Sequence, residues 1–172
     1  MTMEAADVGL LVLRLVTGLL FAVHGAQKTF GLWGGQGLRG WQGTIERLGY
    51  RPGYPVAVLT ALAELVGGLL IAVGLLTPLA GLLVVGQSVV IVFGVHWKRG
   101  FFNRDNGFEF PLVLGAGFLA ILLAGPGAFS VDAVIGLLPS DEIRIGLAVL
   151  ALAGGAVMLA VPRLLRSSQP AQ

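Results

Sequence analysis

The chain contains no cysteine among its 172 residues. This absence excludes disulfide bonds, thiolate metal sites and any thiol redox cycle carried by this chain alone. Charged residues are also scarce, at 12% of the chain, whereas hydrophobic residues make up 56%. The sequence has no haem, flavin or nucleotide motif, so the chain cannot carry out two-electron chemistry without a partner. A composition of this kind is typical of an integral membrane protein.

Five apolar runs have the length of a membrane span. Each covers most of a ~30 Å hydrocarbon core at about 1.5 Å per residue, although the fourth is short and needs flanking residues. The runs are Val8 to Ala26, Val56 to Leu76, Leu79 to Val95, Phe110 to Ala124 and Ile143 to Val161. We therefore expect an all-α membrane protein that forms a single integral membrane domain over residues 1–172.

Lysine and arginine are divided unevenly between the two ends of these spans. Threading five spans through a bilayer places nine of the eleven Lys and Arg residues on the side opposite the N-terminus: Lys28, Arg39, Arg47, Arg51, Lys98, Arg99, Arg104, Arg163 and Arg166. Because cytoplasmic loops carry the Lys and Arg excess, we expect the N-terminus outside and the C-terminus in the cytoplasm. These charges suit anionic lipid headgroups and give no argument for a nucleic acid partner.

The segment between the first two spans has helical periodicity. Leu38, Trp41, Ile45 and Leu48 recur at helical spacing, with polar residues between them. The pattern predicts either a short helix lying in the membrane interface or an amphipathic helix packed on the bundle. Both alternatives remain open from the sequence.

Two ionisable residues lie inside predicted spans. Glu64 shares a helical face with small residues, which lets another helix approach and turns the carboxylate toward protein. Arg14 in the first span lies at a depth that differs from that of Glu64 by only ~6 Å. An unpaired charge near the middle of a bilayer costs ~2.5–3.5 kcal/mol, so we predict an intramembrane ion pair between Arg14 and Glu64. A pair that only fixes helix register is the alternative.

A second group of polar residues is expected at the cytoplasmic ends of the spans. His24 and His96 reach similar depths, and Lys28 and Glu109 belong to the same level. A lone histidine at a helix end is usually an interface residue, but two histidines with a carboxylate favour a functional site. Their spacing matches no local metal motif, so no metal is expected. Gln87 lies opposite His96 on a helical wheel and is therefore placed outside this group.

Spaced motifs in the first four spans resemble the DoxX family of small bacterial membrane proteins. The resemblance covers about Arg14 to Gly125. Its motifs are Arg14-x-x-x-Gly18-x-x-Phe21-x-x-His24-Gly25-x-x-Lys28-x-Phe30, Ala63-Glu64-x-x-Gly67-Gly68 with Gly74-Leu75-x-Thr77, then Gly100-Phe101-Phe102 and Gly107-x-Glu109.

This resemblance implies a bacterial inner-membrane protein with a four-helix transmembrane core over about 8–125. The span at about 143–161 is then an extra C-terminal transmembrane helix. It also implies a link to oxidoreductase systems, since DoxX relatives form a membrane subunit of thiosulfate:quinone oxidoreductase. Other relatives are membrane partners of sulfurtransferase and superoxide dismutase in oxidative-stress defence. The substrate does not follow from the resemblance.

The first functional hypothesis is therefore a membrane subunit of a redox complex that binds quinone, with a protein partner that supplies electrons. His24 and Glu64 would exchange protons with the quinone oxygens, and Arg14 would keep Glu64 ionised. The substrate-binding residues would be Lys28, His96 and Glu109. A small-solute or proton-coupled transporter, whose pathway a homodimer could enclose, and a scaffold for soluble redox enzymes are the alternatives. Whether this chain is itself an enzyme is left open.

Overall fold

The structure, a computed structural model, describes residues 4–167, which form helices and no strand. The helices are α1 (Ala5–Phe30), α2 (Gly37–Arg47), α3 (Gly53–Val73), α4 (Thr77–Val90), α5 (Glu109–Ala124), α6 (Val131–Ile135) and α7 (Asp141–Ser167). The helix of α4 continues through a π-helical turn, Ile91–His96, and a 3-10 turn, Trp97–Arg99. Two further 3-10 turns, Leu32–Gly34 and Asn103–Asp105, lie in the connections.

Four of the described helices are long and apolar enough to cross a membrane: Ala5–Phe30, Gly53–Val73, Thr77–Arg99 and Asp141–Pro162. The fifth apolar helix, Glu109–Ala124, has 16 residues and is shorter than a typical span. This agrees with the short fourth run in the sequence. The all-α multi-pass membrane fold expected from the sequence is confirmed.

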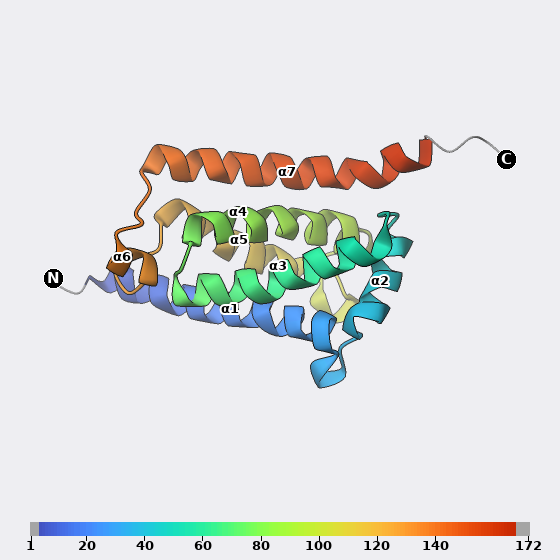
Figure 1. The fold of residues 1–172 in the computed structure, drawn as a ribbon, viewed down its shortest axis with the longest axis horizontal. Helices are drawn as coiled ribbons and strands as arrows, with labels where there is room; N and C mark the ends of the chain where they lie inside the picture. The colour runs from blue at the N-terminus through green and yellow to red at the C-terminus, as the bar shows by residue number, and fades with distance from the viewer. Residues whose placement is uncertain (1–3, 168–172) are drawn as a thin grey trace.

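The long helices lie side by side and run in alternate directions (Figure 1). We call one end of the bundle the α2 end and the other the α6 end, after the short helices that lie there. Helix α1 begins at the α6 end, and α7 finishes at the α2 end. Five passes between the two ends therefore separate the start of α1 from the end of α7.

Helices α1 and α3 pack closely because glycines face each other across the contact. A Cβ added to Gly68 would lie 2.6 Å from both the carbonyl oxygen of Gly18 and the backbone nitrogen of Ala22. The contact is equally tight at Gly25, where an added Cβ would clash with the backbone of Leu65. Small residues let transmembrane backbones approach in this way. The close contact brings the C-terminal half of α1 beside the face of α3 that carries Glu64.

We expect Gly68→Ala to lower the free energy of unfolding by about 1–3 kcal/mol, because the new methyl group must push α1 and α3 apart. An SDS unfolding titration in mixed micelles measures the change. Gly9→Ala on α1 is the matched control, since nothing lies within 4 Å of a Cβ at that position. Equal stability of the two variants would show that the helices tolerate separation.

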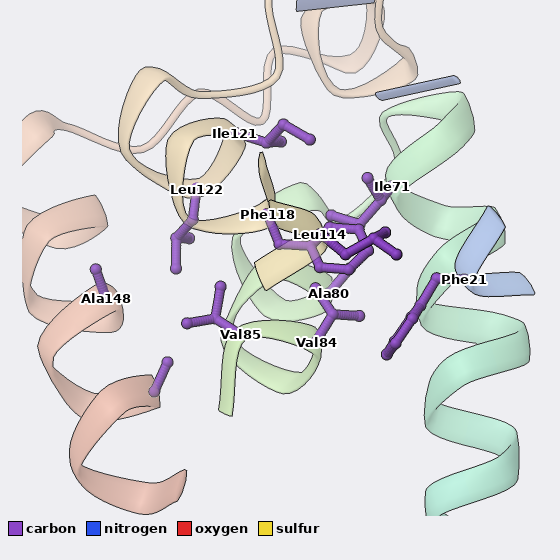
Figure 2. Packing of buried hydrophobic residues seen from close by; sticks show 11 residues of the cluster. Phe21, Ile71, Ala80, Val84, Val85, Leu114, Phe118, Ile121, Leu122 and Ala148 are labelled. Atoms are coloured by element: carbon purple, nitrogen blue, oxygen red, sulfur yellow. The ribbon is translucent and has the colours of Figure 1, made fainter. Parts of the chain in front are cut away.

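The apolar core joins helices α1, α3, α4, α5 and α7. Phe118 is fully buried near its centre, and its ring meets Phe21 edge to face with centroids 5.0 Å apart. Figure 2 shows this cluster, with Ala148 reaching it from α7. The core therefore holds these five helices together.

Helix α2 packs on the bundle. Its apolar residues Trp41 and Ile45 are buried against Ala57 and Ala61 of α3. The Trp41 indole Nε1 donates a hydrogen bond to Thr60 Oγ1 at 2.9 Å. Of the two alternatives left by the sequence, the contacts favour the helix packed on the bundle.

A proline explains how the last helix is tied to the α2 end. Pro162 lies inside α7 and has no N–H, so the Met158 carbonyl loses the helical bond it would otherwise accept. The hydroxyl of Tyr50, in the turn between α2 and α3, donates to that carbonyl at 3.1 Å. Burial raises the pKa of the Tyr50 phenol, which keeps the donor protonated.

Candidate functional site

A cavity of about 560 Å³ opens at the α2 end of the bundle. We call it the polar cavity. The buried residues that line it are Phe21, Trp41, Glu64, Ser88 and Leu114, and the exposed ones are Gln36, Arg47, Arg99, Asn103 and Asn106. The remaining lining residues are half-buried: His24, Lys28, Thr44, Leu48, Ile91, Val95, His96, Phe110 and Pro111. The volume and the mixture of apolar walls with a few polar groups are those of a small-molecule site.

Glu64 is the most deeply buried charged residue of the polar cavity. Its side chain is 1% exposed and forms an ion pair through Oε1 with Lys28 Nζ. The same oxygen accepts a hydrogen bond from Gln87 Nε2 at 2.7 Å. Within residues 4–167, the other oxygen, Oε2, has no hydrogen-bond partner. Burying a carboxylate oxygen without a hydrogen-bond donor costs several kcal/mol of lost solvation, so most buried oxygens have a donor. Oε2 is therefore the atom of Glu64 that is available to bind a ligand.

The predicted ion pair between Arg14 and Glu64 is wrong. The Arg14 guanidinium donates instead to the carbonyl oxygens of Pro126, at 2.6 Å, and Phe129, in the connection between α5 and α6. Both charged residues are buried, as expected, but each has a different partner. Arg14 therefore lies outside the polar cavity and near the opposite end of the bundle.

The direction of side chains on a helix explains the error. Every Cα–Cβ bond of an α-helix tilts toward the helix N-terminus. Helix α1 begins at the α6 end, so Arg14 leans toward that end and Lys28 leans toward the middle of the bundle. Helix α3 begins at the α2 end, so Glu64 leans toward Lys28. A depth calculation alone missed this difference.

A buried carboxylate that the sequence analysis missed completes the α6 end. Asp132 is fully buried and accepts hydrogen bonds from the backbone nitrogens of Leu76 and Thr77, each at 2.7 Å. These nitrogens belong to the first turn of α4, where orphan N–H groups and the helix dipole favour an anion. The charge of Asp132 also acts on Arg14. Together the two residues hold the connection between α5 and α7 against α1 and α4 at the α6 end.

Gln87 requires a second correction, because it was placed outside the site. Its amide nitrogen binds Glu64 Oε1 and also donates to the Thr60 carbonyl at 3.0 Å. The helical wheel that separated Gln87 from His96 assumed 100° per residue throughout. The turn Ile91–His96 is π-helical and rotates less per residue, so the wheel does not hold across it.

The two histidines come together at the polar cavity as expected. His24 lies beside Phe110, with ring centroids 5.8 Å apart. His96 Nδ1 lies 2.7 Å from the carbonyl oxygen of Asn106. Both rings line the polar cavity. No group of three His, Asp or Glu side chains able to hold a metal ion is found among the residues that the structure describes.

Lys28 is placed at the polar cavity as expected, whereas Glu109 is not. The Lys28 ammonium binds Glu64 and lies 4.0 Å from the centroid of the Trp41 ring, so one cation connects α1, α2 and α3. Glu109 Oε2 instead accepts a hydrogen bond from the Asn103 backbone nitrogen at 3.0 Å. Glu109 shapes the loop before α5 and does not line the polar cavity.

Comparison with known proteins places this site in a family. The DoxX family model matches residues 9–97, which include Arg14, Lys28, Glu64 and both histidines. The chain belongs to the DoxX family. No solved structure is significantly similar to it.

Two curated relatives match most of this DoxX protein. It is 34% identical over 131 residues to the protein named "Inner membrane protein YqjF" of Escherichia coli K12, and the match covers 75% of this chain and 93% of the relative. It is 32% identical over 120 residues to the protein named "Putative oxidoreductase CatD" of Bacillus subtilis 168, covering 69% of this chain and 81% of the relative.

The residues that carried the DoxX resemblance separate into two groups in space. Lys28, His24 and Glu64 line the polar cavity. Arg14 and Thr77 belong to the closed α6 end, where Arg14 binds loop carbonyls and Thr77 begins α4. One sequence signature therefore contains both the groups of a candidate site and the groups that hold the far end of the bundle together.

Proposed function

We propose that this DoxX protein is a quinone-binding membrane subunit of a redox complex, and that the polar cavity holds the quinone head group. The observation that carries the proposal is the free Oε2 of Glu64, buried in a cavity of about 560 Å³. Arg14, which the sequence analysis included, has no part in it. Lys28 and Gln87 take the place given to Arg14, because they hold the other oxygen of Glu64.

The residues of the polar cavity fit a quinone ring. A bound quinone supplies reversible chemistry that takes up two electrons and two protons. Phe21, Phe110 and Leu114 offer apolar surface to a flat ring, while the polar groups lie among them. A ring with an oxygen at each end needs a donor or an acceptor at two separated points. His24 and Glu64 come from different helices and can serve the two points.

The protein residues divide the proton chemistry between them. Lys28 and Gln87 hold Oε1 of Glu64 and fix the orientation of the carboxylate, so Oε2 faces the ring as an acceptor for a hydroxyl proton. His24 provides the second exchangeable proton, since a neutral imidazole has one donor and one acceptor nitrogen. The buried apolar residues of the wall lower the local dielectric constant and strengthen these interactions.

The electrons must come from a partner, because the chain has no redox cofactor motif. We propose that this donor belongs to sulfur or oxidative-stress metabolism, as the family resemblance implies. The name of the Bacillus subtilis relative, an oxidoreductase, supports a redox role.

We also propose that the α2 end faces the cytoplasm of a bacterium and that the membrane is the inner membrane. The α2 end carries Lys28, Arg39, Arg47 and the cations of the 97–104 segment, and α7 ends on the same side. The name of the Escherichia coli relative supports the inner membrane.

The test is quinol binding by the purified protein in quinone-free nanodiscs, with Glu64→Gln as the variant. We expect the reduced form of decylubiquinone to bind the wild type and to bind Glu64→Gln about tenfold more weakly. A lost hydrogen bond to a charged acceptor is worth about 1.5–3 kcal/mol. Glu109→Gln is the matched control, because it makes the same chemical change at the same end outside the polar cavity.

The outcomes separate the three functional classes. Equal quinol affinity in wild type and Glu64→Gln, or no binding, contradicts the quinone proposal. Solute flux into liposomes would then favour transport, although the closed α6 end speaks against an open pathway. Capture of soluble redox enzymes without either activity would leave a scaffold.

A further inference from the structure

We infer that His96 carries protons between water at the α2 end and the interior of the polar cavity. The inference rests on the proposed quinone function and adds a route for its protons. It depends on one hydrogen bond, on the position of the ring in the cavity wall, and on the backbone that holds both.

The hydrogen bond fixes which nitrogen of His96 carries the proton. Nδ1 lies 2.7 Å from the Asn106 carbonyl oxygen, and a carbonyl oxygen only accepts hydrogen bonds. Nδ1 must therefore be the protonated nitrogen, and Nε2 of the neutral ring has a free lone pair. In the part of the chain that the structure describes, no group donates a hydrogen bond to Nε2. His96 is thus prepared as a proton acceptor.

The backbone around His96 is built to hold this arrangement. His96 ends the π-helical turn Ile91–His96, and such turns are common at functional sites. Asn106 has a left-handed backbone, with φ of 58°, which asparagine tolerates better than most residues. Its own nitrogen donates to the Asn103 carbonyl at 2.9 Å. The carbonyl that binds Nδ1 is therefore presented by an ordered turn.

His96 occupies an intermediate position in the wall of the polar cavity. It is half-buried, whereas Glu64 is fully buried and Arg99 is exposed. The other charged or titratable groups that line the cavity are His24 and Lys28 from α1, and Arg47 from α2. Of the lining groups, His96 is the one whose acceptor nitrogen is set by a backbone carbonyl.

Quinone reduction consumes protons, so the polar cavity needs a group that can accept a proton from water and pass it inward. Reduction of the ring takes two electrons from the protein partner and two protons. One proton comes from the protonated Glu64 carboxyl and one from the doubly protonated His24 ring, which leaves an ionised Glu64 and a neutral His24. Both residues must then recover protons from water. His96 Nε2 binds a proton from water at the α2 end and releases it inward through cavity water to His24 or Glu64. The ring returns to its neutral Nδ1–H form at the end of each cycle.

The tautomer can be tested without any quinone. We expect ¹⁵N NMR of the wild type in nanodiscs to assign the Nδ1–H form to His96 at a pH where the ring is neutral. An Nε2–H form would overturn the inference, because the acceptor would then be absent.

Proton uptake during reduction of bound decylubiquinone by reduced methyl viologen, which gives up electrons without releasing protons, tests the route itself. We expect His96→Asn to slow uptake, followed with a pH indicator in a stopped-flow instrument, by about 100-fold. The asparagine amide can still donate to the Asn106 carbonyl, so the loop keeps its anchor. Added imidazole should restore much of the rate. Lys98→Met, exposed and two residues away, is the control.

The outcomes distinguish this inference from the proposed function. If wild type binds no quinone, the proposed function fails before the route is tested. If His96→Asn binds quinone and takes up protons at the wild-type rate, the inference is wrong and the proposed function survives. A loss of affinity equal to the loss of rate, without imidazole rescue, would make His96 a binding residue and also overturn the inference.

Discussion

Lys28→Met is expected to lower the free energy of unfolding by about 3–5 kcal/mol, the largest effect of any single change considered. The substitution keeps most of the apolar stem but removes the ammonium that binds Glu64 Oε1. Among residues 4–167, a carboxylate that is 1% exposed is then left with the Gln87 amide as its donor. The cation above the Trp41 ring is lost as well. An SDS titration in mixed micelles measures the change.

A second substitution should recover much of the stability. In Lys28→Met/Glu64→Gln the buried group is neutral, and a neutral amide costs less to bury than an unpaired carboxylate. The control is Lys98→Met, which removes an exposed ammonium. If Lys28→Met and Lys98→Met are equally stable, the ion pair does not hold α1 to α3.

Arg14→Met is expected to destabilise the protein by about 3 kcal/mol through the opposite end of the bundle. The Pro126 and Phe129 carbonyls each lose a charge-assisted hydrogen bond, and each such bond is worth about 1.5–3 kcal/mol. Asp132 also loses the cation that compensates it. Faster proteolysis of the 125–137 connection should accompany the change, with the exposed Arg39→Met as control.

The same variant separates two accounts of Arg14. The sequence hypothesis had Arg14 hold Glu64 ionised, in which case Arg14→Met would weaken quinol binding as strongly as Glu64→Gln does. The contacts give Arg14 a structural role at the α6 end. We therefore expect stability to fall while quinol affinity stays near that of the wild type. A parallel loss of affinity would contradict this account.

The sequence was sufficient for the membrane spans and for four of the polar groups that meet at the polar cavity: His24, Lys28, Glu64 and His96. Apolar runs of membrane length predict the helices, because the bilayer demands that length. The small residues around Glu64 correctly predicted that its side chain faces protein and not lipid. His24, Lys28 and His96 were brought together by simple depth arithmetic, since helices rise by a constant amount per residue.

The errors have physical causes that differ in kind. The partner of Glu64 could have been predicted from the tilt of Cα–Cβ bonds, which favours Lys28 over Arg14. The role of Gln87 could not, because a π-helical turn changes the rotation of the helix without a clear signal in the sequence. Asp132 was missed because it lies outside the predicted spans, and only the fold brings it to the first turn of α4.

The closed α6 end has a consequence for energy conservation. Arg14, Asp132 and the loop they hold leave the polar cavity with its opening at the α2 end. If the polar cavity binds quinone as proposed, protons taken up and released through that opening return to the same aqueous phase, so their exchange moves no proton across the bilayer. Moving one charge against 100 mV stores about 2.3 kcal/mol, and proton exchange at this site would store none of it. The proposed reaction would then dispose of electrons without pumping protons.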